Sequence, residues 1–151
     1  MDSPLTPGRS GVVRPGVEAD LPSLIAIDPI TQGDAQRSEL LTASVERGEC
    51  LVYEDRSAIS GLVIVRPHHF FERDFVELLV VTAQRRRLGI GRQLLAAAIG
   101  ARGTDAIFTS TNQSNWPMRT LLEEGGWSLS GRLEGLDGGD PELVYFWKDH
   151  H

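Results

Sequence analysis

The sequence predicts one α/β domain in which helices flank a mixed sheet. The hydrophobic period alternates between that of helices and that of strands, in the order β-α-α-β-β-β-α-β-α-β-β. A length of 151 residues, with 40% hydrophobic and 24% charged residues, suits one compact domain with one core. We therefore expect a domain over residues 11–148, preceded by a flexible tail over 1–10 that is rich in Pro, Ser and Gly.

Local patterns predict the elements of the first half of the chain. A short β-branched strand ends at Pro15-Gly16, and Asp20 stands where it can cap the next helix, whose first turn tolerates Pro22. From Cys50 the period is that of strands and predicts a hairpin, which Pro67-His68-His69 is expected to interrupt. The segments expected here are a strand at 12–14, helices at 21–27 and from 34 to about 47, and strands at 51–53 and 58–65.

The second half begins with a strand that is apolar on both faces except for Glu77, which predicts a central position in the sheet. An Arg-rich turn leads into a helix, and a Gly- and Asp-rich turn over 131–141 separates the two closing strands. The elements expected here are strands at 75–81, 106–110, 127–129 and 143–147, and helices from about 90 to 101 and from 115 to about 124.

Composition excludes several classes of function. A net charge of −6 disfavours a nucleic-acid binder, because such proteins usually carry a basic surface that neutralises phosphates. No apolar run suits a signal peptide or a membrane span, so we expect a cytoplasmic protein with no membrane partner. The single cysteine, Cys50, cannot form an intramolecular disulfide, and His68 and His69 lack a Cys or acidic partner at ligand spacing. We therefore expect no bound metal.

A glycine-rich turn, Arg86-Arg87-Leu88-Gly89-Ile90-Gly91, follows the apolar strand and opens a helix. Glycine lets the backbone approach a phosphate closely, and the N–H groups and dipole of a helix start attract anions. The arginines, which continue to Arg92, suit the same ligand. The alternative is a plain strand-to-helix connection in which glycine relieves strain. A dinucleotide-binding turn is disfavoured because its third glycine would fall at Leu94.

This turn resembles the acetyl-CoA signature of the GNAT superfamily of N-acetyltransferases, Gln/Arg-x-x-Gly-x-Gly/Ala, which Arg86, Gly89 and Gly91 satisfy. The apolar strand before the turn is also similar to the pattern of that family. The resemblance covers roughly residues 12–148, nearly the whole chain, and implies a central mixed, mostly antiparallel sheet flanked by helices.

A second segment supports the same resemblance. Asn115, with Met118 three residues later and Gly126-Trp127 beyond it, is similar to the family's Asn-x-x-Ala and Gly-Phe segment. Two matches in the right order and spacing are far more specific than either one alone.

The resemblance implies where acetyl-CoA binds. The helix start would hold the pyrophosphate, and the strand end would lie along the pantetheine arm, which Asn115 reaches from the next helix. A strand N–H at or near Val81 would stabilise the oxyanion formed on attack. The residues implied to bind the cofactor are Leu79, Val80 and Val81 of the strand, Arg86, Arg87, Leu88, Gly89, Ile90, Gly91 and Arg92 of the turn, and Asn115 and Met118.

Glu77 is the candidate general base. An alkyl amine has a pKa of about 10.4 and must lose a proton before it attacks near neutral pH. Glu77 is the only charge in its strand, and alternation directs it to the face of Leu79 and Val81. Burial beside apolar neighbours would raise its pKa toward a useful range. Family members often carry an acid at this position; the alternative is a solvated residue at the entrance of the strand.

The chain departs from the family at Leu122. Family members commonly have a tyrosine there, seven positions after the Asn, which protonates the departing thiolate. A thiol has a pKa of about 8.5, so CoA can also leave as a thiolate or take a proton from water. Tyr145 is a candidate substitute, with a core strand residue as the alternative interpretation.

The sequence therefore predicts an acetyl-CoA-dependent N-acetyltransferase whose acceptor is an amine of a small molecule, peptide or protein. The alternative is a non-catalytic acyl-CoA-binding or regulatory module, which Leu122 favours and Glu77 disfavours. We expect His68 and His69 in a loop over the acceptor cleft, and a homodimer is compatible with this interpretation.

Overall fold

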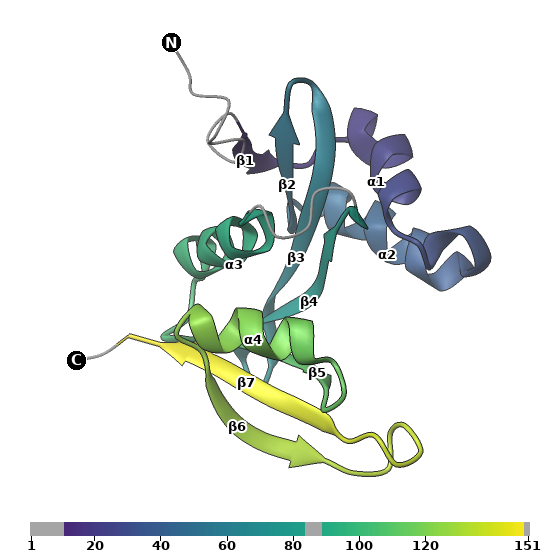
Figure 1. The fold of residues 1–151 in the computed structure, drawn as a ribbon. Helices are drawn as coiled ribbons and strands as arrows, with labels where there is room; N and C mark the ends of the chain where they lie inside the picture. The colour runs from purple at the N-terminus through teal and green to yellow at the C-terminus, as the bar shows by residue number, and fades with distance from the viewer. Residues whose placement is uncertain (1–10, 84–88, 150–151) are drawn as a thin grey trace. The chain divides into compact units, whose positions relative to one another are not determined.

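The computed structural model of the chain describes residues 11–83 and 89–149. Within these ranges the elements follow the order that the sequence predicts, with short 3₁₀ turns added at Glu18–Asp20 and Thr31–Gly33. The predicted tail over 1–10 lies outside the described residues. Figure 1 labels β1 (Val12–Pro15), α1 (Leu21–Ile27), α2 (Ala35–Glu46), β2 (Cys50–Asp55), β3 (Ala58–Phe70), β4 (Arg73–Val81), α3 (Ile90–Ala101), β5 (Ala106–Asn112), α4 (Trp116–Glu124), β6 (Ser128–Leu133) and β7 (Glu142–Lys148).

Seven strands of the described chain form one mixed sheet in the order β1-β2-β3-β4-β5-β7-β6. Antiparallel ladders join β1 to β2, β2 to β3, β5 to β7 and β6 to β7. β4 and β5 are parallel, as expected of strands joined through a helix, here α3. This arrangement confirms the predicted α/β fold with a mostly antiparallel mixed sheet, and the place of β4 in the order confirms that the strand is central.

The described chain divides into two compact units. The first comprises the residues up to Ile64 together with Leu78–Ala98, and so contains β1, β2, α1, α2, the start of β3, the end of β4 and most of α3. The second comprises Val65–Glu77 and the chain from Ile99 onward, and so contains the remainder of β3 and β4 with β5, α4, β6 and β7.

Helices α1 and α2 cover one face of the strands in the first unit. Leu78 and Val80 of β4 pack against the core on this face. The opposite face of β3 carries α3, because a Cβ atom at Gly61 would lie 2.9 Å from Cδ1 of Leu94 and 3.1 Å from Cγ2 of Ile90. Glycine at position 61 therefore lets the first turns of α3 pack directly on the sheet. The buried core members are Leu24, Leu41, Cys50, Val52, Leu62 and Ile64.

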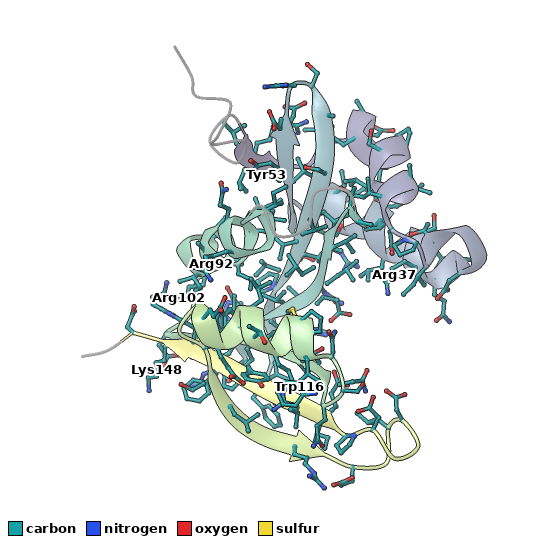
Figure 2. The ribbon with its side chains drawn as sticks, in the orientation of Figure 1. Arg37, Tyr53, Arg92, Arg102, Trp116 and Lys148 are labelled. Carbon is teal, nitrogen blue, oxygen red and sulfur yellow. The ribbon has the colours of Figure 1, made fainter. Side chains whose placement is uncertain are left out.

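The segment between α1 and α2 is organised by the buried carboxylate of Asp28. This carboxylate accepts hydrogen bonds from Oγ1 of Thr31 at 2.7 Å, from the backbone N–H of Ile30 at 3.2 Å and from Nη1 of Arg37 at 3.1 Å. Arg37 comes from α2 (Figure 2), where Asp34 caps the helix by accepting from the backbone N–H of Gln36. The connection is therefore held by side chains at both of its ends.

The prediction that Asp20 caps α1 with its side chain is wrong. Its carboxylate instead accepts hydrogen bonds from both terminal nitrogens of Arg14, at 2.8 and 3.0 Å, and from the backbone N–H of Val17 at 2.8 Å. The bidentate contact pairs two full charges, so the carboxylate turns toward β1 rather than toward the helix.

The expected interruption at Pro67-His68-His69 is also wrong, because β3 continues without a break to Phe70. The strand absorbs the irregularity through a positive φ angle of 52° at His68, and the positive φ angles of 48° at Phe71 and 65° at Glu72 belong to the tight turn that follows. His68 and His69 thus belong to the end of a strand and not to a loop.

The second unit is held together around Asp74 and Thr109. The buried carboxylate of Asp74 accepts from the backbone N–H of His68 at 3.2 Å and of Gly103 at 2.8 Å, which ties the β3–β4 hairpin to the connection between α3 and β5. Oγ1 of Thr109 donates to the carbonyl of Val76 at 3.0 Å beside the parallel ladder that pairs Asp74–Val76 with 107–109. These bonds define where β4 lies relative to β5 just before Glu77.

Candidate active site

Gly89, the first described residue after the segment 84–88, has a backbone conformation that suits a phosphate-binding turn. Gly89 has a φ of 80°, and apart from its chain neighbours and the backbone of its own helix, no atom of the described residues would lie within 4 Å of a Cβ atom placed on it. Its carbonyl accepts from the backbone N–H of Gln93 at 3.0 Å, so Gly89 begins the first turn of α3. A residue in the left-handed region with open space beside it allows a ligand to approach the backbone. Arg86, Arg87 and Leu88 of the predicted turn lie outside the described residues.

The start of α3 fits a pyrophosphate. Ile90 is buried, whereas Arg92 is exposed one position after Gly91 and projects from α3 in Figure 2. The first N–H groups of a helix have no acceptor within that helix, and the helix dipole is positive at this end. A cationic side chain beside such a start adds to the attraction for an anion. This part of the first unit therefore has features that attract an anionic ligand.

The end of β4 presents alternate residues to opposite faces. Val80 packs against the core beneath α1 and α2, so Leu79 and Val81 face the other way, and both are half-buried. Val81 is the last residue of the strand, and the following N–H, that of Thr82, donates to the carbonyl of Ser60 at 2.9 Å. Leu79 and Val81 therefore lie on the face of β4 that is turned away from this core.

Asn115 has a structural role at the start of α4. Its Oδ1 accepts from the backbone N–H of Met118 at 3.3 Å, and its Nδ2 donates to Oγ1 of Thr111 at 3.0 Å. The side chain is therefore the N-cap of the helix that carries Met118. An amide nitrogen has two N–H groups, so one donor remains for a ligand besides the bond to Thr111.

Glu77 has basic neighbours where the sequence led us to expect apolar ones. Its carboxylate lies 3.9 Å from Nη1 of Arg66 and 4.0 Å from Nε2 of His69, and its side chain is 28% exposed. The structure thus brings together Arg66, His69 and Glu77 near the end of the β3–β4 hairpin. A partly exposed carboxylate at this place can accept a proton from an incoming amine, directly or through water.

Arg66 was missed as a site residue by the sequence reasoning. A signal for it exists, since Arg66 and Glu77 lie equally far from the turn at Phe71-Glu72 and strands joined by a tight turn pair symmetrically about it. The expectation that the hairpin breaks at Pro67 concealed this pairing.

Leu122 is the fully buried residue of α4, so the position that carries tyrosine in the family is a core position in this chain. Tyr145 is fully buried as well, and its hydroxyl donates to Oε2 of Glu123 at 3.0 Å and accepts from Nε of Arg119 at 3.2 Å. Arg119 also lies 3.8 Å over the ring of Trp116, which Figure 2 labels on α4. Tyr145 thus joins β7 to α4, in agreement with its interpretation as a core residue.

Two further findings concern ligands and membranes. Among residues 11–83 and 89–149, no three His, Cys, Asp or Glu side chains gather in a way that could hold a metal ion. No helix in the same part of the chain is both long and apolar enough to cross a bilayer.

Comparison with known proteins identifies the family to which the chain belongs. The family model described as Acetyltransferase (GNAT) family matches residues 19–126. A crystal structure of a GNAT-family acetyltransferase from Bacillus cereus is 31% identical, covering 93% of this chain and 99% of that chain with a TM-score of 0.86. No curated protein sequence matches the chain.

More distant structures share the fold. A ribosomal-protein-alanine N-acetyltransferase from Brucella melitensis is 23% identical, with coverage of 91% and 99% and a TM-score of 0.75. A putative acetyltransferase from Salmonella typhimurium, solved with its cofactor acetyl-CoA, is 17% identical, with coverage of 94% and 96% and a TM-score of 0.74. The matched family model and the Bacillus cereus structure show that this chain belongs to the GNAT family of N-acetyltransferases.

Proposed function

We propose that the protein transfers the acetyl group of acetyl-CoA directly to a primary amine. The amine nitrogen attacks the thioester carbonyl, a C–N bond replaces the C–S bond, the proton of the amine passes to Glu77, and CoA leaves as a thiolate. The observation that carries this proposal is the strand–glycine–helix connection, in which Gly89 opens α3 after the central strand β4. Such a connection suits a diphosphate and has open space where the ligand must lie.

Direct attack is supported by the chemistry of the only cysteine in the chain. Cys50 is buried, and burial raises the pKa of its thiol to about 11. The thiolate is the nucleophilic form of cysteine, so Cys50 is a poor carrier for an acyl group. A mechanism through an acyl-cysteine intermediate is therefore disfavoured.

We assign each part of the cofactor to the residues that the fold offers it. The pyrophosphate lies at the helix start, and the pantetheine lies along the strand edge formed by Leu79, Val80 and Val81, with the N–H at or near Val81 facing the acetyl oxygen. Asn115 and Met118 contact the same arm, using the second amide N–H of Asn115. Residues 11–148 together form the acetyltransferase domain. The residues assigned to the pyrophosphate are Arg86, Arg87, Leu88, Gly89, Ile90, Gly91 and Arg92.

A non-catalytic acyl-CoA-binding module is the second candidate. The burial of Leu122 favours it, because α4 then offers no hydroxyl at the family's acid position. The two candidates differ in one observable, since a binding module retains acetyl-CoA without releasing CoA when amines are added. Glu77 favours the enzyme because a carboxylate beside two basic side chains has no evident use in a binding module.

The role of Tyr145 can be tested by the pH dependence of turnover. We expect turnover to rise with pH as the base ionises and then to level off, because no dedicated acid protonates CoA. The Tyr145→Phe variant should have the same profile, since the hydroxyl is engaged by Glu123 and Arg119. A bell-shaped profile that loses its alkaline limb in Tyr145→Phe would contradict this and place Tyr145 in the active site.

Cofactor binding can be tested without an acceptor. Isothermal titration calorimetry should show that CoA and acetyl-CoA bind more tightly than pantetheine, which lacks the phosphates that the helix start and arginines recognise. Equal affinities for CoA and pantetheine would remove the turn at Gly89 from the binding site.

A further inference from the structure

All five phenylalanines of the chain gather on one face of the second unit. The ring of Phe70 lies 4.8 Å from that of Phe71, 5.2 Å from that of Phe75 and 5.1 Å from that of Phe108, between ring centroids. Phe108 continues the row to Phe146 at 5.9 Å. These residues come from β3, the adjoining turn, β4, β5 and β7, so the folded sheet, and not local sequence, brings them together.

A groove of about 610 Å³ lies over this face. Its volume is in the range of pockets that bind small molecules. Its apolar lining includes Phe70, Phe71, Phe108, Val144 and Phe146, and Phe71 is 81% exposed. Large aromatic side chains left partly open to solvent indicate a surface that a ligand covers.

The groove faces away from α4. Tyr145 bonds to side chains of α4, so its neighbours Val144 and Phe146 in β7 face the opposite side of the sheet. Oγ1 of Thr111 likewise contacts Asn115 at the start of α4, and Phe108 therefore lies on the same side as the groove. The helix of the second unit thus does not fill this surface.

Glu77 does not line the groove, but the aromatic row leads toward it through Phe75, whose ring lies 5.2 Å from that of Phe70. Phe75 and Glu77 are two residues apart in β4 and therefore share a face. His69 lies near both of them. Its ring centroid is 6.1 Å from that of Phe75, and its Nε2 is 4.0 Å from Oε2 of Glu77. The proposed base therefore lies at one end of an aromatic surface.

Charges at the rim limit what the groove accepts. Arg73 pairs with Asp105 at 3.5 Å and Arg132 pairs with Glu134, so these cations are largely balanced within the protein. Lys148, labelled in Figure 2, adds a further cation to the lining. Such a rim disfavours a second positive charge on the ligand, as a diamine would carry.

We infer that the acceptor is a monoamine that carries an aromatic ring two or three bonds from its nitrogen. The ring lies over Phe70, Phe108 and Phe146, and the nitrogen lies at Glu77, where it loses its proton as it attacks the thioester. Arylalkylamines and peptides with an aromatic N-terminal residue share this chemistry. This inference rests on the proposed function, because it describes the acceptor half of the same site.

The test compares kcat/KM for four acceptors with the wild-type protein. Phenethylamine should exceed butylamine by on the order of 10- to 100-fold, the range for burying an additional aromatic group. Phenethylamine should exceed 1,5-diaminopentane by at least as much. A tripeptide that begins with Phe is the fourth acceptor: a higher value than for phenethylamine identifies a peptide acceptor, and a lower value identifies a small arylalkylamine. If butylamine or the diamine is as good as phenethylamine, the inference is wrong.

Variants locate the effect in the groove. Phe108→Ala should reduce the preference for phenethylamine over butylamine, measured as the ratio of their kcat/KM values, by about 10-fold. Val12→Ala is the control: it truncates an exposed apolar residue of β1 and should retain the wild-type ratio. An unchanged ratio in folded Phe108→Ala would overturn the inference, and if this variant does not fold, the wild-type series decides. Failure of the proposed function has a different signature, namely that no amine is acetylated or that calorimetry detects no CoA binding.

Discussion

Glu77→Gln should lower turnover with a good acceptor near neutral pH by on the order of 10²-fold, the effect expected from loss of a general base. The amide keeps the size of the side chain and its position beside Arg66 and His69 but cannot accept the proton of the amine. Affinity for acetyl-CoA, measured by calorimetry, should be retained, because Glu77 is assigned to the acceptor and not to the cofactor.

Glu72→Gln is the matched control for this variant. Glu72 is an exposed residue in the turn of the same hairpin, and its substitution removes the same charge. We expect its turnover to remain within about twofold of wild type, as for an exposed charge outside the site. Equal turnover of Glu77→Gln and Glu72→Gln would reduce Glu77 to a strand residue and leave water to take the proton.

Gly89→Val should weaken CoA binding by at least about 10-fold. The valine side chain would occupy the open space beside Gly89, where the pyrophosphate must approach the first turn of α3. Losing even one or two charge-assisted hydrogen bonds to phosphate, worth about 1.5–3 kcal/mol each, accounts for a loss of this size. Calorimetry with CoA measures the effect directly.

Backbone strain is the main complication, because any side chain is disfavoured at a φ of 80°. Gly48→Val provides the matched control, since Gly48 lies in the same unit with a φ of 71° and also has no atom within 4 Å of a Cβ position. Both variants should lose similar thermal stability, but only Gly89→Val should lose affinity for CoA. Unchanged affinity in folded Gly89→Val would refute the assignment of the turn.

Elements with strong periodicity and clear ends were predictable from sequence. The helix expected from about 90 to 101 is α3 with the same bounds, because the apolar period is regular and Gly89 marks its start. Strand β4 was placed at the centre of the sheet because its run of apolar residues suits burial on both faces.

Features that depend on contacts between distant residues were not predictable. Asp20 looks like a cap because it precedes a helix, yet Arg14 in β1 claims its carboxylate. β3 looks broken at Pro67 because proline and the following histidines are poor strand formers, yet a positive φ at His68 accommodates the irregularity.

The candidate site divides in the same way. A motif that is local in sequence identified Gly89 and Asn115. Gly89 stands at the predicted helix start, whereas Asn115 is the N-cap that precedes α4 and not its first residue. The aromatic groove depends on pairing among four strands, so single-sequence periodicity carries no signal for it. The neighbours of Glu77 depend on hairpin register, which only the symmetry about the turn at Phe71-Glu72 indicates.

Acetyl transfer itself is the central claim, and one measurement tests it most directly. The protein is mixed with acetyl-CoA and a panel of primary amines, free CoA is followed with a thiol reagent, and mass spectrometry identifies the acetylated product. The account predicts that CoA release requires an amine, equals the amount of N-acetylated product formed, and falls sharply in Glu77→Gln. If the protein binds acetyl-CoA but no amine is acetylated, the account is contradicted and the chain is a binding module.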